Sequence, residues 1–541
     1  MKRRKLLVTS ALPYANGKIH LGHMVEHIQT DIFVRFQKLI GNTCYYMCAD
    51  DAHGTAIMLS AEKEGLKPED YIESIRQDHK TDFLGFDISH DVYYSTHSNE
   101  NKTLSETVFL AAQKAGAIEE REIEQYYCEQ SNLFLSDRFI KGQCPKCGAE
   151  EQYGDACEKC YSTYDATQLI NPISVYSGKT PILKKSVHYF FKLAGFEEKI
   201  KFWLDSGHVH STVKNKLQEW FDAGLKDWDI SRDAPYFGFQ IPGSDNKFFY
   251  VWLDAPIGYI ATTKHWCDME KKEDFDSIWK NGDFEIHHFI GKDILYFHTL
   301  FWPAMLDVAG FCLPKKVAVH GFLTVNGEKM SKSRGTFILA SKYLEHLNPE
   351  FLRYYYAAKL TEGMDDLDLS LEDFTNKINS DVLGKVVNIA SRLGSILHKR
   401  CDGRLTTIPV EAKSVLDQIL AKKDIIFDAY ETLNYQLAMK EIMKCADLAN
   451  KFIDQTAPWT VAKEDSSKAA ELCTAGLNAC RYLIIYLKPV LPQIAAGIES
   501  FLKISALRWD DLDQHLIQHE INPYQHLASR LTLEDVEKIL S

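Results

Sequence analysis

The sequence predicts an α/β domain built on a parallel sheet, divided by a cysteine-containing insertion and followed by a helical bundle. Three observations predict this order. Strands alternate with a helix near the N-terminus, strand-like runs return after a Cys-, Gly- and Tyr-rich stretch, and helical patterns replace strands after about residue 381. The chain has 541 residues, and a single hydrophobic core stops growing near roughly 250–300 residues, so several modules are expected.

The α/β domain begins with a βαβ pattern. Lys5–Ser10 and Thr43–Ala49 read as buried strands, and His23–Leu39 between them has the periodicity of an amphipathic helix. A strand, a helix and a second strand in this order favour a parallel sheet. The runs expected to complete this sheet after the insertion are Phe248–Leu253, Phe284–Ile290 and Val317–Val325.

The last part of the chain and its composition fit a packed globular protein. Helical patterns such as Asp381–Lys399 and Ile425–Phe452 predict the bundle. Hydrophobic residues make up 45% of the chain and charged residues 25%. The apolar run Leu6–Val8 is too short for a secretion signal, and no run reaches the roughly 18 apolar residues of a membrane span. A soluble, cytoplasmic protein with no membrane partner is expected.

Four of the 13 cysteines form two Cys-x2-Cys pairs in the insertion. Four thiolates at this spacing suit one tetrahedral zinc ion, and four protein ligands leave no open position for catalysis, so the zinc would be structural. A redox or disulfide function is the less favoured alternative in a cytosolic chain. The other cysteines are scattered and are expected to be reduced core residues. The expected zinc ligands are Cys144, Cys147, Cys157 and Cys160.

A pattern suited to phosphate follows the first strand. Pro13–His23 (PYANGKIHLGH) place a turn and then His-x-Gly-His at the start of the expected helix. The N-terminus of a helix offers free N–H groups and partial positive charge, and Gly22 allows a ligand to approach the backbone closely. His20 and His23, three apart, project to the same side. Metal ligation and a plain helix start are the alternatives.

A cationic loop is expected much later in the chain. Asn326-Gly327 after a β-rich run is the signal of a hairpin turn, and the loop that follows contains Lys329, Lys332 and Arg334. Such a loop could close on a triphosphate and stabilise the charge that develops at the α-phosphate. A solvated basic loop is the alternative.

Together, the two segments resemble the paired signature sequences of class I aminoacyl-tRNA synthetases. These are His20–His23 (HLGH) and Lys329–Ser333 (KMSKS), separated by an inserted connective domain, with Leu21 in place of the usual isoleucine. The resemblance implies a Rossmann-like catalytic domain in which His20 and His23 contact ATP. It also implies that Lys332, supported by Lys329, stabilises the pentavalent phosphate. The ATP-binding residues that it implies are Pro13, Tyr14, Asn16, Gly17, His20, Gly22, His23 and Lys332.

Four further segments resemble the methionyl family. They are Ala11–Tyr14 (ALPY), Cys48–Thr55 (CADDAHGT), Val251–Tyr259 (VWLDAPIGY) and Gly291–His298 (GKDILYFH). A thioether favours an apolar, aromatic slot with a hydroxyl or N–H near sulfur, and these segments carry such residues. By family analogy Asp51 pairs with the substrate ammonium. Ordinary core packing is the alternative for each aromatic residue. The expected methionine-binding residues are Ala11, Leu12, Tyr14, Asp51, Trp252, Ala255, Pro256, Tyr259, Ile294 and His298.

RNA binding has to be reconciled with a net charge of −13, because phosphate binding normally requires a basic face. Residues 381–404 supply a local excess of Lys and Arg, and one face of the expected helix is polar. A solvated helix face is the alternative. Asn388, Arg392 and Trp459 resemble the family's anticodon-reading positions. Trp459 would stack on a splayed base while the other two bond to base edges.

The resemblance extends from Leu6 to the last helices and implies a two-step reaction. Methionine attacks the α-phosphate of MgATP, which gives methionyl-adenylate and pyrophosphate, and the terminal ribose hydroxyl of initiator or elongator tRNA(Met) then accepts the methionyl group. One structural Zn²⁺, Mg²⁺ with ATP and a monomer without a C-terminal dimerisation domain are expected. The alternatives are a leucine, isoleucine or valine synthetase, a tRNA-independent nucleotidyltransferase and a non-enzymatic zinc-dependent RNA-binding protein.

The implied domains follow the changes of pattern along the chain. The expected boundaries are 1–115 for the first half of the catalytic domain, 116–232 for the connective domain with its zinc knuckle, 233–320 for the second half of the catalytic domain, 321–380 for the KMSKS loop and stem-contact region, and 381–541 for the α-helical anticodon-binding domain.

Overall fold

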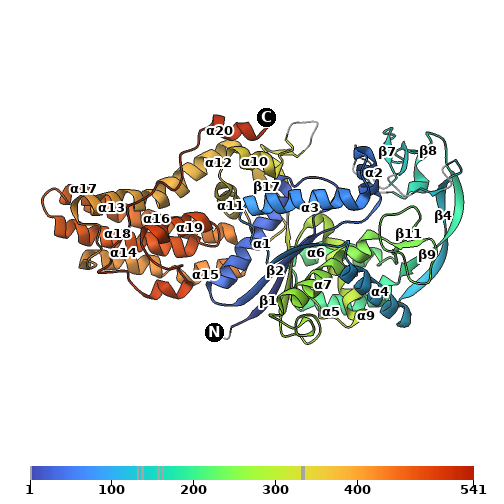
Figure 1. Cartoon of the computed structure of the whole chain (residues 1–541), viewed down its shortest axis with the longest axis horizontal. Helices are drawn as coiled ribbons and strands as arrows, with labels where there is room; N and C mark the ends of the chain where they lie inside the picture. Colours follow the sequence, from blue (N-terminus) through green and yellow to red (C-terminus); the bar gives the residue numbers. More distant parts are fainter. Residues whose placement is uncertain are drawn as a thin grey trace.

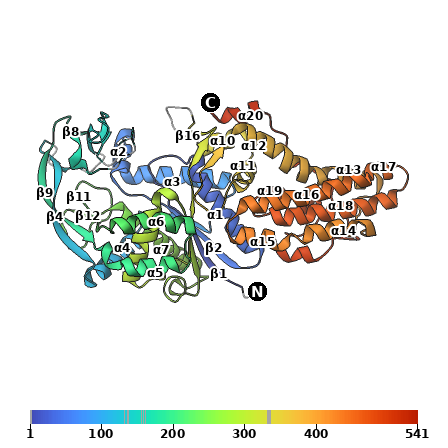
Figure 2. The ribbon, with the colours of Figure 1, turned by 180° about the vertical axis from the view of Figure 1, so that it is seen from behind.

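The computed structural model describes residues 3–130, 133–135, 139–154, 157, 159–160, 162, 164–330 and 336–540. Three parts lie in a row: the helical bundle at one end, a sheet with its covering helices in the middle, and the insertion at the other end (Figure 1). The view from behind shows strands β4 (Ile118–Cys128) and β9 (Ile182–Phe191) curving along the outer edge of the insertion (Figure 2). The predicted split α/β domain followed by a bundle is confirmed.

The central sheet has five parallel strands in the order β14-β13-β1-β2-β3. The predicted βαβ unit is present, because helix α1 (Leu21–Leu39) joins β1 to β2. Strand β1 has β2 on one side and β13 on the other, so the strand order reverses there, and a crevice is expected beyond the carboxyl ends. The strands are β14 (Lys316–His320), β13 (Glu285–Gly291), β1 (Lys5–Ser10), β2 (Thr43–Asp50) and β3 (Val92–Ser95).

Helices cover the sheet and the insertion carries small antiparallel sheets. The helices of the sheet domain and insertion are α2 (Thr55–Glu64), α3 (Pro68–Gly85), α4 (Asn99–Lys114), α5 (Glu197–Asp205), α6 (Ser211–Ala223), α7 (Val251–Glu270), α8 (Phe275–Trp279) and α9 (Trp302–Ala309). The short strands are β5 (Leu133–Phe134), β6 (Ile140–Gln143), β7 (Gln152–Tyr153), β8 (Ile170–Ser174), β10 (Trp228–Asp229), β11 (Ser231–Asp233) and β12 (Lys247–Phe249).

The predicted parallel strand at 248–253 is wrong. Only β12 is extended there; it pairs antiparallel with β11 in a separate two-stranded sheet, and α7 begins at Val251. Helix α7 is buried around most of its circumference between Leu253 and Cys267, so its first residues show no polar stripe. A short run of apolar and aromatic residues cannot by itself distinguish a buried strand from a buried helix.

The predicted strand 317–325 is two strands in different sheets. Strand β14 ends at His320, and β15 (Leu323–Val325) lies between β16 (Glu328–Lys329) and β17 (Leu367–Leu369). The break falls at Gly321, where a Cβ atom would lie 2.2 Å from the carbonyl oxygen of Asp365. The close approach of a second backbone therefore divides the run.

The C-terminal part is helical in the described residues, as predicted. The predicted helix 425–452 is interrupted: Leu433 has a φ of 67°, and the Asn434 side chain caps the next helix by accepting from Leu437 N–H at 3.1 Å. The helices are α10 (Ala340–His346), α11 (Pro349–Ala357), α12 (Leu371–Lys377), the π-helical segment Ile378–Val387, α13 (Asn388–Arg400), α14 (Val410–Leu420), α15 (Lys423–Glu431), α16 (Tyr435–Thr456), α17 (Pro458–Val461), α18 (Ser466–Leu487), α19 (Pro492–Phe501) and α20 (Leu533–Glu537).

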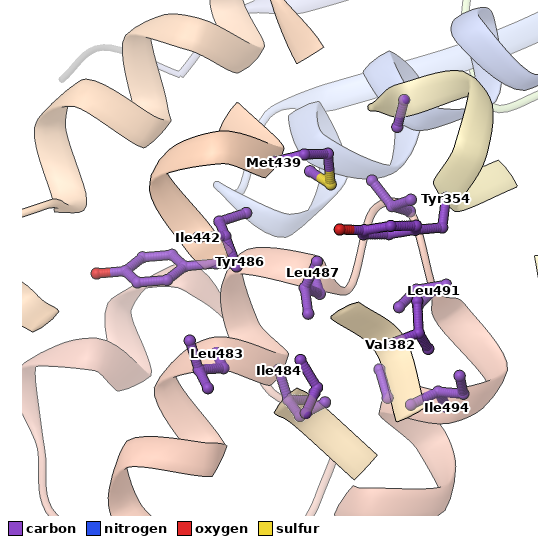
Figure 3. Packing of buried hydrophobic residues seen from close by; sticks show 14 of the residues in the cluster. Tyr354, Val382, Met439, Ile442, Leu483, Ile484, Tyr486, Leu487, Leu491 and Ile494 are labelled. Carbon is purple, nitrogen blue, oxygen red and sulfur yellow. The ribbon is translucent and has the colours of Figure 1, made fainter. Parts of the chain in front are cut away.

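One apolar core joins the bundle to the sheet domain. Side chains of α16, α18 and α19 converge with Tyr354 of α11 and with Val382, as Figure 3 shows. The same cluster continues through α1 to Leu6 and Val8 of β1. Helix α1 therefore packs against α11 and α15, while its first turn reaches the carboxyl ends of the strands.

A buried ion pair reinforces this junction. Arg353 of α11 donates to Asp31 of α1 at 2.6 Å, and both side chains have no exposed surface. The Arg353 guanidinium also donates to the carbonyl oxygens of Phe86, Pro489 and Val490, at 3.3, 3.0 and 2.9 Å. One arginine thus ties α1, the end of α3 and the chain before α19 together. Among the described residues, no helix is both long and apolar enough to cross a membrane.

Candidate active site

A cleft of about 960 Å³ opens where β1, β2, β13 and β14 end. Most of the residues expected to bind substrates line it, although they come from five separate stretches of the chain. Gly17 does not line the cleft, and Lys332 lies outside the described residues. The predicted residues at the cleft are Ala11, Leu12, Pro13, Tyr14, Asn16, His20, Gly22, His23, Asp51, Trp252, Ala255, Pro256, Tyr259, Ile294, His298 and Lys329.

The two signature segments meet at this cleft. Leu21 N–H donates to the carbonyl oxygen of Ile338 at 3.0 Å, and Ala340 N–H donates to that of Ile19 at 2.9 Å. The chain that follows the cationic loop therefore pairs with the residues that flank His20. The predicted hairpin before the loop is confirmed, because β15 and β16 pair antiparallel across Asn326 and Gly327, with φ of 50° and 77°.

His20 and His23 form the start of α1. The His20 side chain accepts from Gly22 N–H at 3.1 Å, and His23 Nδ1 accepts from the His20 backbone N–H at 3.3 Å. The two rings stack with centroids 3.7 Å apart, which confirms that they project to the same side. Burial, assisted by the neighbouring His20, lowers the pKa of His23 well below its ordinary value, so its imidazole is neutral at neutral pH.

A buried carboxylate, that of Asp51, lines the same cleft as the aromatic residues. Among the described atoms, Asp51 Oδ1 has no hydrogen-bond partner although it is buried. Burial and the nearby Asp254 raise the pKa of Asp51 well above its ordinary value. Asp254 is bonded to His53 Nδ1, so its charge is partly compensated. A buried carboxylate oxygen without a partner is costly, and a bound cation would relieve that cost.

The aromatic side of the cleft has a fixed hydrogen-bond pattern. His298 Nδ1–H donates to the carbonyl oxygen of Ile294 at 3.1 Å, which leaves Nε2 to accept from the Tyr259 hydroxyl at 2.8 Å. Burial lowers the pKa of His298 to about 4, so the ring is neutral. Trp252 stacks on Phe297 with centroids 3.7 Å apart. The slot is therefore apolar and aromatic, with one oriented hydroxyl.

Several residues at the cleft were not predicted from the sequence. Glu26 lies one turn after His23 on α1, and Asp293 belongs to the GKDI run, so both had a local signal. Burial raises the pKa of Glu26 to about 7, and its carboxylate lies 3.5 Å from His320 Nε2. Arg232, at the end of the insertion, had no recognisable pattern. Other residues that line the cleft include Thr55, Ser60, Tyr153, Tyr236, Tyr250, His320, Met330 and Phe337.

The four predicted cysteine ligands come together in the insertion. Their sulfur atoms all lie within 4.8 Å of one another, with Cys144 3.8 Å from Cys160 and Cys147 3.5 Å from Cys157. The backbone N–H of Cys160 donates to the Cys157 sulfur at 3.3 Å, as in a turn shaped around a thiolate. Four converging thiols fit one tetrahedral metal ion. Cys128 bonds to Ser177 instead and is not part of the cluster.

The bundle presents an aromatic residue beside a cation. The Arg392 guanidinium of α13 lies 4.5 Å from the ring centroid of Trp459 on α17, and it also pairs with Asp454 at 3.2 Å. Trp459 is 38% exposed. Asn388 lies one turn before Arg392 on the same helix. The structure therefore brings together the three residues predicted to read bases.

Comparisons with known proteins agree with this arrangement. Residues 6–394 match the family model of tRNA synthetases class I (M), and residues 408–529 match that of the anticodon binding domain of methionyl tRNA ligase. A structure of Mycobacterium tuberculosis methionyl-tRNA synthetase in complex with methionyl-adenylate is similar at 23% identity and a TM-score of 0.81, covering 97% of this chain and 99% of that chain. The apo form of Mycobacterium tuberculosis methionyl-tRNA synthetase is similar at 21% identity and a TM-score of 0.74. This match covers 98% of this chain and 99% of that chain. These structures show that the fold is shared over 97–98% of this chain.

Proposed function

The chain belongs to the class I tRNA synthetases (M), the methionine-tRNA ligases, and from this premise we propose how its residues divide the two steps of the reaction. The observation that carries the proposal is the single cleft. It joins the cationic hairpin, the start of α1, a buried carboxylate with one oxygen that lacks a partner, and an aromatic slot with one oriented hydroxyl. The hairpin and the start of α1 suit the triphosphate of ATP, the carboxylate suits an ammonium group, and the aromatic slot suits a thioether.

In the first step, the methionine carboxylate attacks the α-phosphate of ATP and pyrophosphate leaves. The carboxylate is ionised at neutral pH and needs no general base, so catalysis depends on position and charge. His20, His23 and the N–H groups at the start of α1 would bind the phosphates, with Lys329 and Lys332 stabilising the added charge. Mg²⁺ would enter with ATP, and the carboxylates of Glu26 and Asp293 offer the oxygen ligands that it prefers.

Asp51 is proposed to bind the methionine ammonium, and its raised pKa gives a testable pH dependence. The ionised form attracts the ammonium and is lost as pH falls through the raised pKa. KM for methionine should therefore rise as pH is lowered through this raised pKa. Asp51→Asn should raise KM by about 10- to 100-fold, the loss of one hydrogen bond to a charged group. Its KM should no longer depend on pH; an unchanged pH profile would contradict the assignment.

The cysteine cluster is proposed to hold one structural zinc ion. Metal analysis of the purified protein should give one zinc per chain, and Cys147→Ser should reduce this to near zero because one of four thiolates is lost. Cys128→Ser is the matched control, since Cys128 lies in the same insertion but outside the cluster. Equal zinc content in the two variants would reject the site.

In the second step, the terminal ribose hydroxyl of tRNA attacks the activated carbonyl and AMP leaves. Trp459 would stack on an anticodon base, with Asn388 and Arg392 bonding to base edges. The exposed ring and the adjacent guanidinium support this proposal. The expected domain boundaries, the monomeric state and the cytoplasmic location stay predictions.

The two steps can be tested separately. ATP–pyrophosphate exchange should depend on methionine and should not occur with leucine, isoleucine or valine; exchange with leucine alone would overturn the proposed substrate. Trp459→Ala should leave this exchange unchanged and raise KM for tRNA(Met) by about 10- to 100-fold, the loss of one stacked base. Phe202→Ala is the matched control, because Phe202 is 77% exposed on α5 in the insertion.

A further inference from the structure

The turn that leads into α1 is held by groups outside the cleft. Residues 14–17 lie between the end of β1 and the start of α1, and Asn16 lines the cleft whereas Gly17 does not. The turn is joined to the end of β2, because Ala15 N–H donates to the carbonyl oxygen of Asp51 at 2.8 Å. The carbonyl groups of the next two residues of the turn are bound by side chains of α3.

Two buried side chains of α3 make these bonds. The Tyr71 hydroxyl donates to the carbonyl oxygen of Asn16 at 3.1 Å, and His79 Nε2–H donates to that of Gly17 at 2.7 Å. Tyr71 and His79 share one face of α3, about two turns apart. The other ring nitrogen of His79, Nδ1–H, donates to the carboxylate of Asp50 at the end of β2, at 2.6 Å. One imidazole therefore joins α3, β2 and the turn before α1.

Both ring nitrogens of His79 face oxygen acceptors, so both bonds form together only when the ring is an imidazolium. Burial opposes this charge, but the hydrogen bond and the charge of Asp50, helped by the Gly17 carbonyl, raise the pKa of His79 above its ordinary value. The Tyr93 hydroxyl of β3 also donates to Asp50 and lies 3.4 Å from His79 Nδ1. The other titratable groups near the ring are Asp82 on α3 and His23 and His27 on α1.

We propose that His79 is a positioning residue for the reaction with ATP, which holds the turn 14–17 and thereby places Asn16 and the start of α1 where the phosphates bind. The inference rests on the proposed function. His79 does not itself line the cleft, so it acts through the backbone of Gly17. Its two bonds have different effects: the bond to Asp50 stabilises the fold, and the bond to Gly17 places the turn.

Two substitutions separate these bonds, because the amide of asparagine ends at the δ position of the ring and that of glutamine at the ε position. His79→Asn can still donate to Asp50 but cannot reach Gly17. It should lower kcat/KM for ATP by about 10- to 100-fold, as expected when a binding group is misplaced, and leave KM for methionine little changed. His79→Gln can still donate to Gly17, so its kcat/KM for ATP should stay within about threefold of wild type.

The order of stability should be the reverse. His79→Gln removes the charged donor from the buried carboxylate of Asp50, so it should lose more unfolding free energy than His79→Asn. Methionine-dependent ATP–pyrophosphate exchange and urea unfolding of the full-length enzyme measure the two effects. His265→Asn is the matched control, since His265 also bonds to a carboxylate, that of Glu100 at 3.0 Å. If His79→Gln lost more activity than His79→Asn, activity would merely follow stability and the inference would be overturned.

A second variant and a pH profile do not depend on the folding of His79→Asn. Tyr71→Phe removes the hydroxyl that donates to Asn16 and should lower kcat/KM for ATP by about three- to tenfold. In the wild-type enzyme at saturating methionine, kcat/KM for ATP should fall as pH rises through the raised pKa of His79. The neutral ring keeps only one bond, and the carboxylate is the stronger acceptor, so the bond to Gly17 is lost.

This pH step should be absent from His79→Gln, because an amide does not titrate. A Tyr71→Phe enzyme with the kcat/KM of wild type, or the same pH step in His79→Gln, would overturn the inference. A wild-type enzyme without any methionine-dependent exchange would overturn the proposed function instead.

Discussion

His20→Asn should lower kcat/KM for methionine-dependent ATP–pyrophosphate exchange by about 100- to 1,000-fold, the usual cost of removing a group that stabilises charge in the transition state. The melting temperature should stay within about 2 °C of wild type. The reason is that His20 has two functions. Its ring lines the cleft, and it also caps α1 by accepting from Gly22 N–H. Asparagine is among the best N-cap residues, so it keeps the cap and removes only the imidazole.

His20→Ala separates these two functions. The kcat/KM for exchange should fall by the same factor as in His20→Asn. The free energy of unfolding should also fall by about 1 kcal/mol, because alanine cannot cap the helix. Thermal unfolding followed by circular dichroism, together with exchange kinetics, distinguishes the two variants. If His20→Asn retained the wild-type rate, the ring would be only a helix cap.

Asp31→Asn should lower the free energy of unfolding by about 3–5 kcal/mol at pH 7, because it leaves the Arg353 guanidinium buried without a counter-charge. Burial alone would raise the pKa of Asp31, but the charges of Arg35 and Arg353 and hydrogen bonds from Ser89 hold it well below its ordinary value. The carboxylate therefore contributes its stabilisation above its ordinary pKa and loses it only as pH falls, so the full effect is present at neutral pH.

Urea unfolding measures this loss, and a second substitution tests its origin. Adding Arg353→Met to Asp31→Asn should recover a large part of the stability, since the uncompensated charge is then removed. Glu106→Gln is the control, because its ion pair with Lys102 is exposed and should be worth less than about 1 kcal/mol. Equal losses of unfolding free energy in Asp31→Asn and Glu106→Gln would show that the buried pair contributes no more to stability than the exposed pair.

The features predicted well from sequence are those encoded by neighbouring residues. The βαβ unit follows from periodicity within short segments, the Asn326-Gly327 hairpin from the backbone preferences of two residues, and the cysteine cluster from the spacing of two Cys-x2-Cys pairs. The cleft residues were found because their segments resemble those of a known family, and the structure places nearly all of them around one cavity.

The features missed depend on residues far apart in the chain. The run 248–253 reads as a strand because α7 is buried on most sides, a fact that only its tertiary neighbours determine. The bonds of His79 join α3 to the end of β2 and to the turn before α1, and no local pattern marks them. The charge pair of Asp31 and Arg353 spans more than half of the chain and was likewise invisible to sequence reasoning.

The continuous apolar core has a consequence for how this enzyme could be divided. Side chains of α1 and the bundle belong to one hydrophobic cluster. A fragment ending near residue 380 would therefore expose the apolar side chains that pack against the bundle, and it would tend to aggregate. The anticodon-binding part therefore cannot be exchanged as an independent unit without redesigning the face of α1 that packs against it. The parts follow one another as separate stretches of sequence, but they share one hydrophobic core.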